Sequence, residues 1–193
     1  MCLCLGPAKS GKTLLMKRLQ GDEKIDDASH TVPTNGVNLF TIKSKDGHFD
    51  IIVREIGGSM APIWHRYFDR VHKIIYVVDA SNLCQISAAG VLLYSLLVEP
   101  KLQHVKICFV LGKMDLSYRQ MRNEALLMLH FNRLKCEVSQ KITVIEASGM
   151  TGQGIELLRD WIFDPETLKA VGSTGNAAAA AAADNANVIP PKK

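Results

Sequence analysis

The feature that most constrains how this chain can fold is the segment GPAKSGKT, which occupies residues 6–13. It fits the spacing G-x-x-x-x-G-K-[ST], and it stands between a short apolar run at residues 1–5 and a helical pattern at residues 12–19. Glycine lets the backbone turn so that successive N–H groups point inward at phosphate oxygens, and the start of a helix adds positive charge there. The segment therefore predicts a phosphate-binding loop between a strand and a helix, rather than a plain glycine-rich turn with a solvated lysine.

The same spacing assigns a role to individual positions of the loop. We expect Lys12 to reach the β- and γ-phosphates of a nucleotide, and the hydroxyl of Thr13 to bind Mg²⁺. The residues expected to contact the nucleotide here are Gly6, Ala8, Lys9, Ser10, Gly11, Lys12 and Thr13. The loop by itself does not separate kinases, ATPases and GTPases.

Apolar runs alternate with amphipathic segments along the rest of the chain. Strands are predicted at residues 1–5, 37–43, 49–54, 73–79, 105–111 and 142–146, and helices at residues 12–19, 86–98, 119–134 and 155–161. Asp46-Gly47 between the second and third strands is a hairpin signal, so this pair is expected to be antiparallel. The alternation predicts an α/β fold with a six-stranded, mostly parallel sheet, one antiparallel edge strand and helices on both faces.

Composition and charge exclude several classes of partner. The net charge of +4 comes from Lys and Arg residues spread along the chain, so we expect no binding to nucleic acid and no basic membrane patch. The five cysteines are odd in number and scattered, which predicts reduced thiols in a cytosolic or nuclear compartment, and of these we expect a cytoplasmic location. Cys2 and Cys4 alternate on an apolar strand, so they are predicted to be buried thiols rather than metal ligands.

The composition changes near residue 165. Residues 166–193 contain seven consecutive alanines and end in Pro-Pro-Lys-Lys, so we predict a domain at residues 1–165 and a low-complexity, disordered tail at 166–193. The chain shows neither a long apolar span nor a lipidation motif, so no direct membrane anchor is expected. The domain is expected to be a monomer.

Two short segments after predicted strands bear on the choice of base. Gly112-Lys113-Met114-Asp115 and Ala147-Ser148 resemble the guanine-recognition pair of the small GTPases, N-K-x-D and S-A-x. Both follow the carboxyl ends of strands, where an α/β sheet binds ligands. The resemblance implies that Asp115 accepts hydrogen bonds from guanine, that the stem of Lys113 lies along the base, and that the N–H of Ala147 donates to guanine O6. Gly112 stands where these proteins have an asparagine that braces the phosphate loop, and a plain turn with a surface Lys and Asp stays open as the alternative.

The segments HTVPTNGVN (30–38) and IIVREIGGSMAPIWHRYFDRVHKIIYVVDASN (51–82) resemble the two switches of the Arf family of small GTPases. The resemblance extends to about residue 164 and implies a P-loop NTPase G domain that binds GTP or GDP with Mg²⁺. It implies that Thr34 binds Mg²⁺ and the γ-phosphate, and that the N–H of Gly58 binds the same phosphate. Glu55 replaces the family's aspartate of the Mg²⁺ shell, and because it is one methylene longer it either reaches the metal's water differently or turns away.

The position after Gly58 bears on hydrolysis. The family's glutamine, which orients the attacking water, is Ser59 here, and a serine is too short for that task. The resemblance therefore implies weak or partner-dependent hydrolysis. It also implies effectors that contact Trp64 and Tyr67 in the GTP state, exchange and GTPase-activating factors, and recruitment by partners to the Golgi or the cilium in membrane or ciliary protein traffic.

Two other functions remain open from the sequence. Gly112, Glu55 and Ser59 together would suit a scaffold that kept the fold and lost guanine affinity. A P-loop kinase or ATPase would make Lys113 and Asp115 a coincidence. Binding of GTP and GDP, of neither, or of ATP separates the three.

Overall fold

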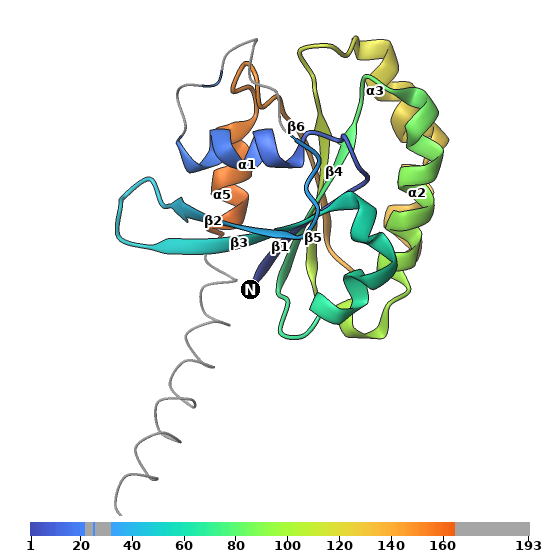
Figure 1. The fold of residues 1–193 in the computed structure, drawn as a ribbon. Helices are drawn as coiled ribbons and strands as arrows, with labels where there is room; N and C mark the ends of the chain where they lie inside the picture. Colours follow the sequence, from blue (N-terminus) through green and yellow to red (C-terminus); the bar gives the residue numbers. More distant parts are fainter. Residues whose placement is uncertain (22–24, 26–31, 165–193) are drawn as a thin grey trace, which may run out of the picture. The chain divides into compact units, whose positions relative to one another are not determined.

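The structure is a computed structural model, and it describes residues 1–21, 25 and 32–164 (Figure 1). The compact unit treated below spans Met1–Ile162. The tail predicted at residues 166–193 lies outside the described residues.

A six-stranded sheet forms the centre of this unit, with the strand order β2-β3-β1-β4-β5-β6. The strands are β1 (Cys2–Leu5), β2 (Val37–Lys43), β3 (Asp50–Ile56), β4 (Lys73–Asp79), β5 (Lys106–Gly112) and β6 (Ile142–Glu146). Only the β2–β3 pairing is antiparallel, and the turn between these strands contains Gly47 at φ +68°. The predicted sheet, with its antiparallel edge strand and the hairpin at Asp46-Gly47, is confirmed.

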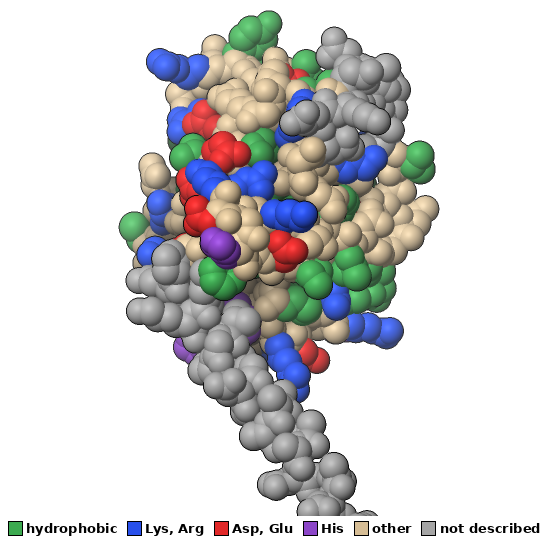
Figure 2. All heavy atoms as spheres, turned by 90° about the vertical axis from the view of Figure 1, so that its left-hand side faces the viewer, with side chains coloured by type: hydrophobic (Ala, Val, Ile, Leu, Met, Phe, Trp, Pro, Cys, Tyr) green, Lys and Arg blue, Asp and Glu red, His purple; other side chains and the backbone are tan. Residues whose placement is uncertain are grey.

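Helices cover both faces of the sheet. Figure 1 shows α1 (Lys12–Gln20) and α5 (Ile155–Ile162) on one side, and α2 (Leu83–Leu97) and α3 (Arg119–Met128) on the other. The hairpin is tied to α5 by Lys45, whose Nζ lies 2.7 Å from Asp160 Oδ1 and 3.3 Å from Glu156 Oε2. On this side of the molecule, Lys and Arg side chains alternate with Asp and Glu side chains (Figure 2).

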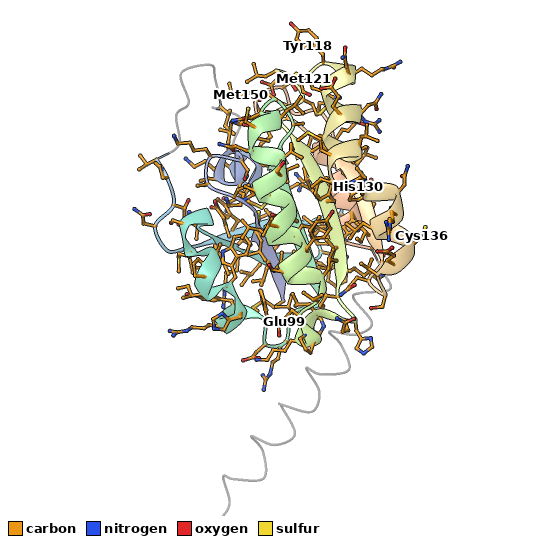
Figure 3. The ribbon with its side chains drawn as sticks, turned by 90° about the vertical axis from the view of Figure 1, so that its right-hand side faces the viewer. Glu99, Tyr118, Met121, His130, Cys136 and Met150 are labelled. Atoms are coloured by element: carbon orange, nitrogen blue, oxygen red, sulfur yellow. The ribbon has the colours of Figure 1, made fainter. Side chains whose placement is uncertain are left out.

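The prediction of one continuous helix at residues 119–134 is wrong. The helix is broken into α3 and α4 (Phe131–Glu137) at His130, whose backbone has φ +45° (Figure 3). A left-handed residue cannot continue a right-handed helix, so the chain changes direction there. Two 3₁₀ helices were also not predicted, η1 (Gly58–Tyr67) and η2 (Pro100–Leu102).

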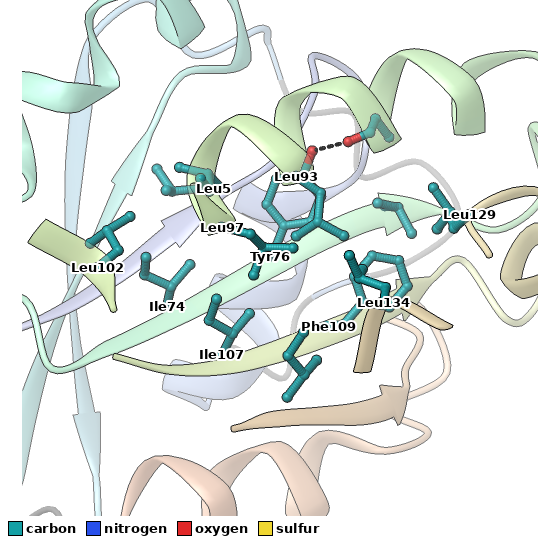
Figure 4. Packing of buried hydrophobic residues seen from close by; sticks show 14 of the residues in the cluster. Leu5, Ile74, Tyr76, Leu93, Leu97, Leu102, Ile107, Phe109, Leu129 and Leu134 are labelled. Carbon is teal, nitrogen blue, oxygen red and sulfur yellow. Dashed lines mark hydrogen bonds between the residues drawn. The ribbon is translucent and has the colours of Figure 1, made fainter. Parts of the chain in front are cut away.

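The core lies between the central strands and the helices α2 to α4 (Figure 4). All seven residues of β4 are buried, as a central parallel strand requires. Tyr76 of β4 stacks on Phe109 of β5 with ring centroids 6.1 Å apart, and its hydroxyl donates to Ala89 O at 2.6 Å. Satisfying that hydroxyl allows a tyrosine to be fully buried.

Cys2 and Cys4 of β1 lie on the other face of the sheet, the face that α5 covers. Cys2 and Cys4 are buried as predicted, and burial raises the pKa of the Cys2 thiol to about 12. Lys73 is also buried, and its Nζ donates to the carbonyl oxygens of Trp161 and Ile162 at 2.6 and 2.8 Å. These bonds attach the last turn of α5 to the start of β4. Among the described residues, no helix is long and apolar enough to cross a membrane.

Candidate nucleotide-binding site

The phosphate loop connects β1 to α1 and turns through three left-handed residues. Gly6, Lys9 and Gly11 have φ of +145°, +65° and +87°. A Cβ on Gly6 would lie 2.1 Å from Val77 O, so only glycine allows the loop to start this close to β4. Gly11 is the N-cap of α1, and a helix that begins at a glycine presents its first N–H groups to an anion rather than to its own side chain.

Lys12 places its ammonium group against the loop. Its Nζ donates to Gly6 O at 3.0 Å and to Pro7 O at 2.8 Å, and lies 3.5 Å from Ser10 Oγ. The side chain is buried, and desolvation lowers the pKa of Lys12 below the ordinary lysine value. Its partners in the loop are neutral, so a phosphate arriving there would meet a buried cation that no carboxylate neutralises through these bonds.

Three oxygen-bearing side chains from distant segments meet beside the loop. Thr13 Oγ1 donates to Glu55 Oε1 at 2.6 Å and lies 3.1 Å from Thr34 Oγ1, which is itself 3.4 Å from Glu55 Oε1. The other oxygen of Glu55 accepts a hydrogen bond from Asn38 Nδ2 at 3.0 Å. The longer side chain of Glu55 therefore points to the predicted Mg²⁺ ligands, and it is held there in a buried position.

This donor set fits Mg²⁺. Hydroxyl and carboxylate oxygens are the ligands that Mg²⁺ prefers, and in nucleotide sites it takes one or two of them together with phosphate oxygens. Within the described part of the chain, no group of three or more His, Cys, Asp or Glu side chains could hold a metal ion alone. The two hydroxyls and one carboxylate beside the loop suit a metal ion that also takes phosphate oxygens.

The predicted switch residues line one pocket with the phosphate loop. A Cβ on Gly58 would lie 2.2 Å from Ala8 N, and one on Gly57 would lie 2.2 Å from Thr34 O, so the backbones are in direct contact. Ser59 is exposed at the pocket, and its Oγ donates to Asn35 Oδ1 at 3.4 Å. The pocket is lined by Ala8, Lys9, Gly11, Lys12, Thr13, Val32, Pro33, Thr34, Asn35, Glu55, Gly58 and Ser59.

The residues predicted to recognise guanine lie at the carboxyl ends of β5 and β6. Asp115 Oδ1 accepts a hydrogen bond from Ser148 Oγ at 2.5 Å, and Ser148 Oγ in turn accepts from Met150 N and Thr151 N. Lys113 Nζ donates to Asp79 Oδ2 at 2.6 Å, and the stem of Lys113 passes Gly11. Lys113, Asp115 and Ser148 are thus brought to the same end of the sheet as the phosphate loop.

Ala147 requires a correction. Its N–H donates to Leu111 O at 2.9 Å as part of the pairing of β5 with β6, so it does not face a base. β6 ends at Glu146 as predicted, but the bond that closes its pairing with β5 comes from the N–H of Ala147. The N–H of Ser148 donates to Gln153 O, so the next N–H along the loop is that of Gly149.

Trp64 also requires a correction. It is buried in the core, with 3% of its surface exposed, and its Nε1 donates to Gly57 O at 3.1 Å. The 3₁₀ helix η1 turns the indole inward, so Trp64 is not an exposed anchor in this structure. Tyr67 is half-buried at the rim of the same core, and Phe68 is buried.

Two further groups at the site were not predicted from the sequence. Asp79 partners Lys113, and the signal for it was its place at the end of β4, in register with Gly112 of β5. Asn38 holds Glu55, and the signal was its register opposite Glu55 in the predicted hairpin.

A phosphate loop between β1 and α1, two switch segments against it, and a Lys–Asp pair beyond β5 define a small GTPase of the P-loop NTPase fold. The chain belongs to the ADP-ribosylation factor family, whose sequence profile matches residues 1–165. Membership implies binding of GTP and GDP, and effector and regulator proteins as partners in general.

Individual relatives agree with this assignment. The chain is 33% identical over 168 residues to human ADP-ribosylation factor-like protein 16, covering 84% of each chain. It is 28% identical over 162 residues to ADP-ribosylation factor-like protein 1 of Caenorhabditis elegans, covering 83% of this chain and 85% of that one.

Solved structures share the fold at lower identity. The Arl6 (BBS3) small GTPase from Trypanosoma brucei, with bound nucleotide analogue GppNp, gives a TM-score of 0.69 at 21% identity and covers 85% of this chain and 95% of that chain. The mammalian SRP receptor gives 0.67 at 16% identity and covers 83% and 97%.

Proposed function

We propose that this chain is a switch that binds GTP or GDP with Mg²⁺, engages effectors in the GTP state and hydrolyses GTP weakly or only with a partner. The observation that supports this best is the cluster of Thr13, Thr34 and Glu55. It joins the phosphate loop, the first switch and the end of β3 through oxygens that suit Mg²⁺. A scaffold with no nucleotide has no need of such a cluster.

The loop residues have the chemistry to bind phosphate. Lys12 would exchange its carbonyl partners for phosphate oxygens, and N–H groups of the loop and of the first turn of α1 would bind the same phosphates. Mg²⁺, when bound, would neutralise phosphate charge, with Thr13, Thr34 and Glu55 as the residues that hold it.

Base selection falls to the loops after β5 and β6. Asp115 has one carboxylate oxygen on Ser148, and this bond fixes its direction for a donor-bearing base edge such as that of guanine. Adenine lacks the matching donors, so it would leave that carboxylate unpaired. We place the loop N–H predicted for Ala147 at Gly149, because the N–H of Ser148 between them donates to Gln153 O.

The switch rests on Thr34 and Gly58, which approach the phosphate loop from two sides. Their segments already touch through Gly57 and Thr34 O. A γ-phosphate would bind both segments at once, and its loss would release both. Effectors then read the exposed part of the second switch, with Tyr67 at its edge.

Hydrolysis is expected to be slow because Ser59 is short. Its hydroxyl reaches Asn35 and extends no further into the pocket. We further propose that the protein acts as a cytoplasmic monomer and that partners recruit it in membrane or ciliary traffic, a role that rests on the family resemblance.

Calorimetric titration of the purified protein with GTP, GDP and ATP, each with and without Mg²⁺, tests the proposal. We expect GTP and GDP to bind, with Mg²⁺ strengthening the binding of GTP, and ATP to bind far more weakly. A protein that binds none of the three is a scaffold, and a preference for ATP would make it a different P-loop enzyme. Either result overturns the proposal.

A further inference from the structure

Asp79, the last residue of β4, is a carboxylate with 6% of its surface exposed. A carboxylate this far from water requires partners for both oxygens. Oδ1 accepts hydrogen bonds from Ser81 N at 3.0 Å and Ser81 Oγ at 2.5 Å. Oδ2 lies 2.6 Å from the Nζ of Lys113, which is the only charged group among these partners.

The bond to Asp79 determines where the side chain of Lys113 lies. Its backbone is left-handed, with φ +58°, and its stem lies against the phosphate loop, because a Cβ on Gly11 would be 3.7 Å from Lys113 Cε. The side chain is one-third exposed, so an unanchored lysine here could swing into solvent. The bond to Asp79 fixes the far end of the stem, and the stem then covers Gly11.

Gly112, the neighbour of Lys113, has no side chain that could brace the phosphate loop. A Cβ at Gly112 would lie 3.0 Å from Val78 O and 3.4 Å from Ser10 O, so the backbone there is packed against both β4 and the phosphate loop. A hydrogen bond from Ala80 N to Gly112 O, 3.1 Å long, ties the ends of β4 and β5 together. The bond between side chains that joins these two strand ends is therefore Asp79–Lys113.

We infer that Asp79 is a positioning residue for guanine nucleotide. It holds the ammonium group of Lys113 so that the lysine stem stays across Gly11, between the phosphate loop and the loop that carries Asp115. This inference rests on the proposed function. It adds a residue on β4 to a site whose predicted members lie elsewhere.

The test measures the affinity and the release rate of GDP and GTP for the full chain carrying Asp79→Asn, Lys113→Gln or both. Asp79→Asn keeps the shape of the side chain and removes its charge, so we expect both affinities to fall about tenfold or more, by faster release. Lys113→Gln should lose at least as much. Asp79→Glu, which keeps the charge, should recover part of the affinity.

The double variant separates positioning from a merely structural role. If Asp79 acts through Lys113, then Asp79→Asn should cause almost no further loss once Lys113 is Gln. Asp69→Asn is the matched control. Asp69 pairs with Lys101 at 2.7 Å, close to the 2.6 Å between Asp79 and Lys113, but on the exposed surface away from the site. This variant should leave the affinity unchanged.

A second variant covers the case in which Asp79→Asn does not fold. Ser81→Ala removes one partner of Asp79 without changing any charge, and we expect a loss of about threefold in affinity that disappears in the Lys113→Gln background. If Asp79→Asn folds and binds like the wild type, or if its loss adds in full to that of Lys113→Gln, the inference is overturned and the proposed function stands. If the wild type binds no guanine nucleotide, both are overturned.

Discussion

The two ends of the site are held together in different ways. At the phosphate end, backbone lies directly on backbone, and glycines at positions 6, 57 and 58 make the contacts, with added Cβ atoms meeting main-chain atoms at 2.1–2.2 Å. At the base end, backbone contacts are also close, since a Cβ on Gly154 would lie 1.9 Å from Glu146 O, but the groups expected to meet the base are side chains held in pairs, Asp79–Lys113 and Asp115–Ser148. The groups expected to hold phosphate are thus mainly backbone set by the fold, while those expected to hold the base are side chains that can be replaced one at a time.

The strongest test of this difference is Gly6→Ala. The new Cβ would collide with Val77 O, and Gly6 has φ +145°, so we expect a loss of about 3–5 kcal/mol in the free energy of unfolding. Gly21→Ala is the matched control: Gly21 has φ +97° with nothing within 4 Å, and should cost about 1–2 kcal/mol. Urea unfolding of both variants measures the difference. Equal losses would mean that the close contact with β4 contributes nothing.

Lys12→Ala is expected to have the next largest effect. It removes the buried cation of the phosphate loop, so GTP affinity should fall about 100-fold while the fold persists. Lys9→Ala is its control, since Lys9 is exposed in the same loop and is predicted to bind through its backbone. Titration with GTP compares them. A loss for Lys9→Ala as large as that for Lys12→Ala would show that the loop attracts phosphate by general charge alone.

The same contrast explains what the sequence could predict. The spacing of Gly6, Gly11 and Lys12 reflects backbone geometry, and the strand, loop and helix it implied are all present. Asp46-Gly47 likewise encodes a turn, and the antiparallel hairpin follows. Such local rules act over a few residues and can be read directly.

Features that depend on packing were missed. Neither glycine nor proline marks the break at His130, and the spacing of the aromatic residues in the second switch does not say that Trp64 faces the core. Ala147 was misplaced because the end of a strand pairing depends on its neighbour, here Leu111. Asp79 could be connected to Lys113 only once the register of β4 and β5 was known.

Glu55→Gln tests whether the oxygen cluster belongs to the fold or to the metal. The amide oxygen can still accept from Asn38 Nδ2 and the amide NH2 can donate to the hydroxyl oxygen of Thr13, so the variant removes the negative charge and keeps the buried side chain hydrogen-bonded. We expect the strengthening of GTP binding by Mg²⁺ to shrink about tenfold. Glu55→Asp keeps the charge and should keep most of this Mg²⁺ effect. Titrations with and without Mg²⁺ check both, and an unchanged Mg²⁺ effect in Glu55→Gln would remove Glu55 from the metal site.

Ser59→Gln is expected to have the smallest effect, because Ser59 is exposed and contributes little to either end. A glutamine extends further into the pocket that Gly58 and Thr34 line, and its carboxamide can orient a water molecule, so single-turnover GTP hydrolysis should rise about fivefold. Ser59→Ala should hydrolyse GTP at the wild-type rate, because the serine hydroxyl is already used by Asn35. If the rate of hydrolysis falls in Ser59→Ala and does not rise in Ser59→Gln, the serine hydroxyl itself orients the water. Hydrolysis would then depend on the contact between Ser59 and Asn35, which joins the two switches.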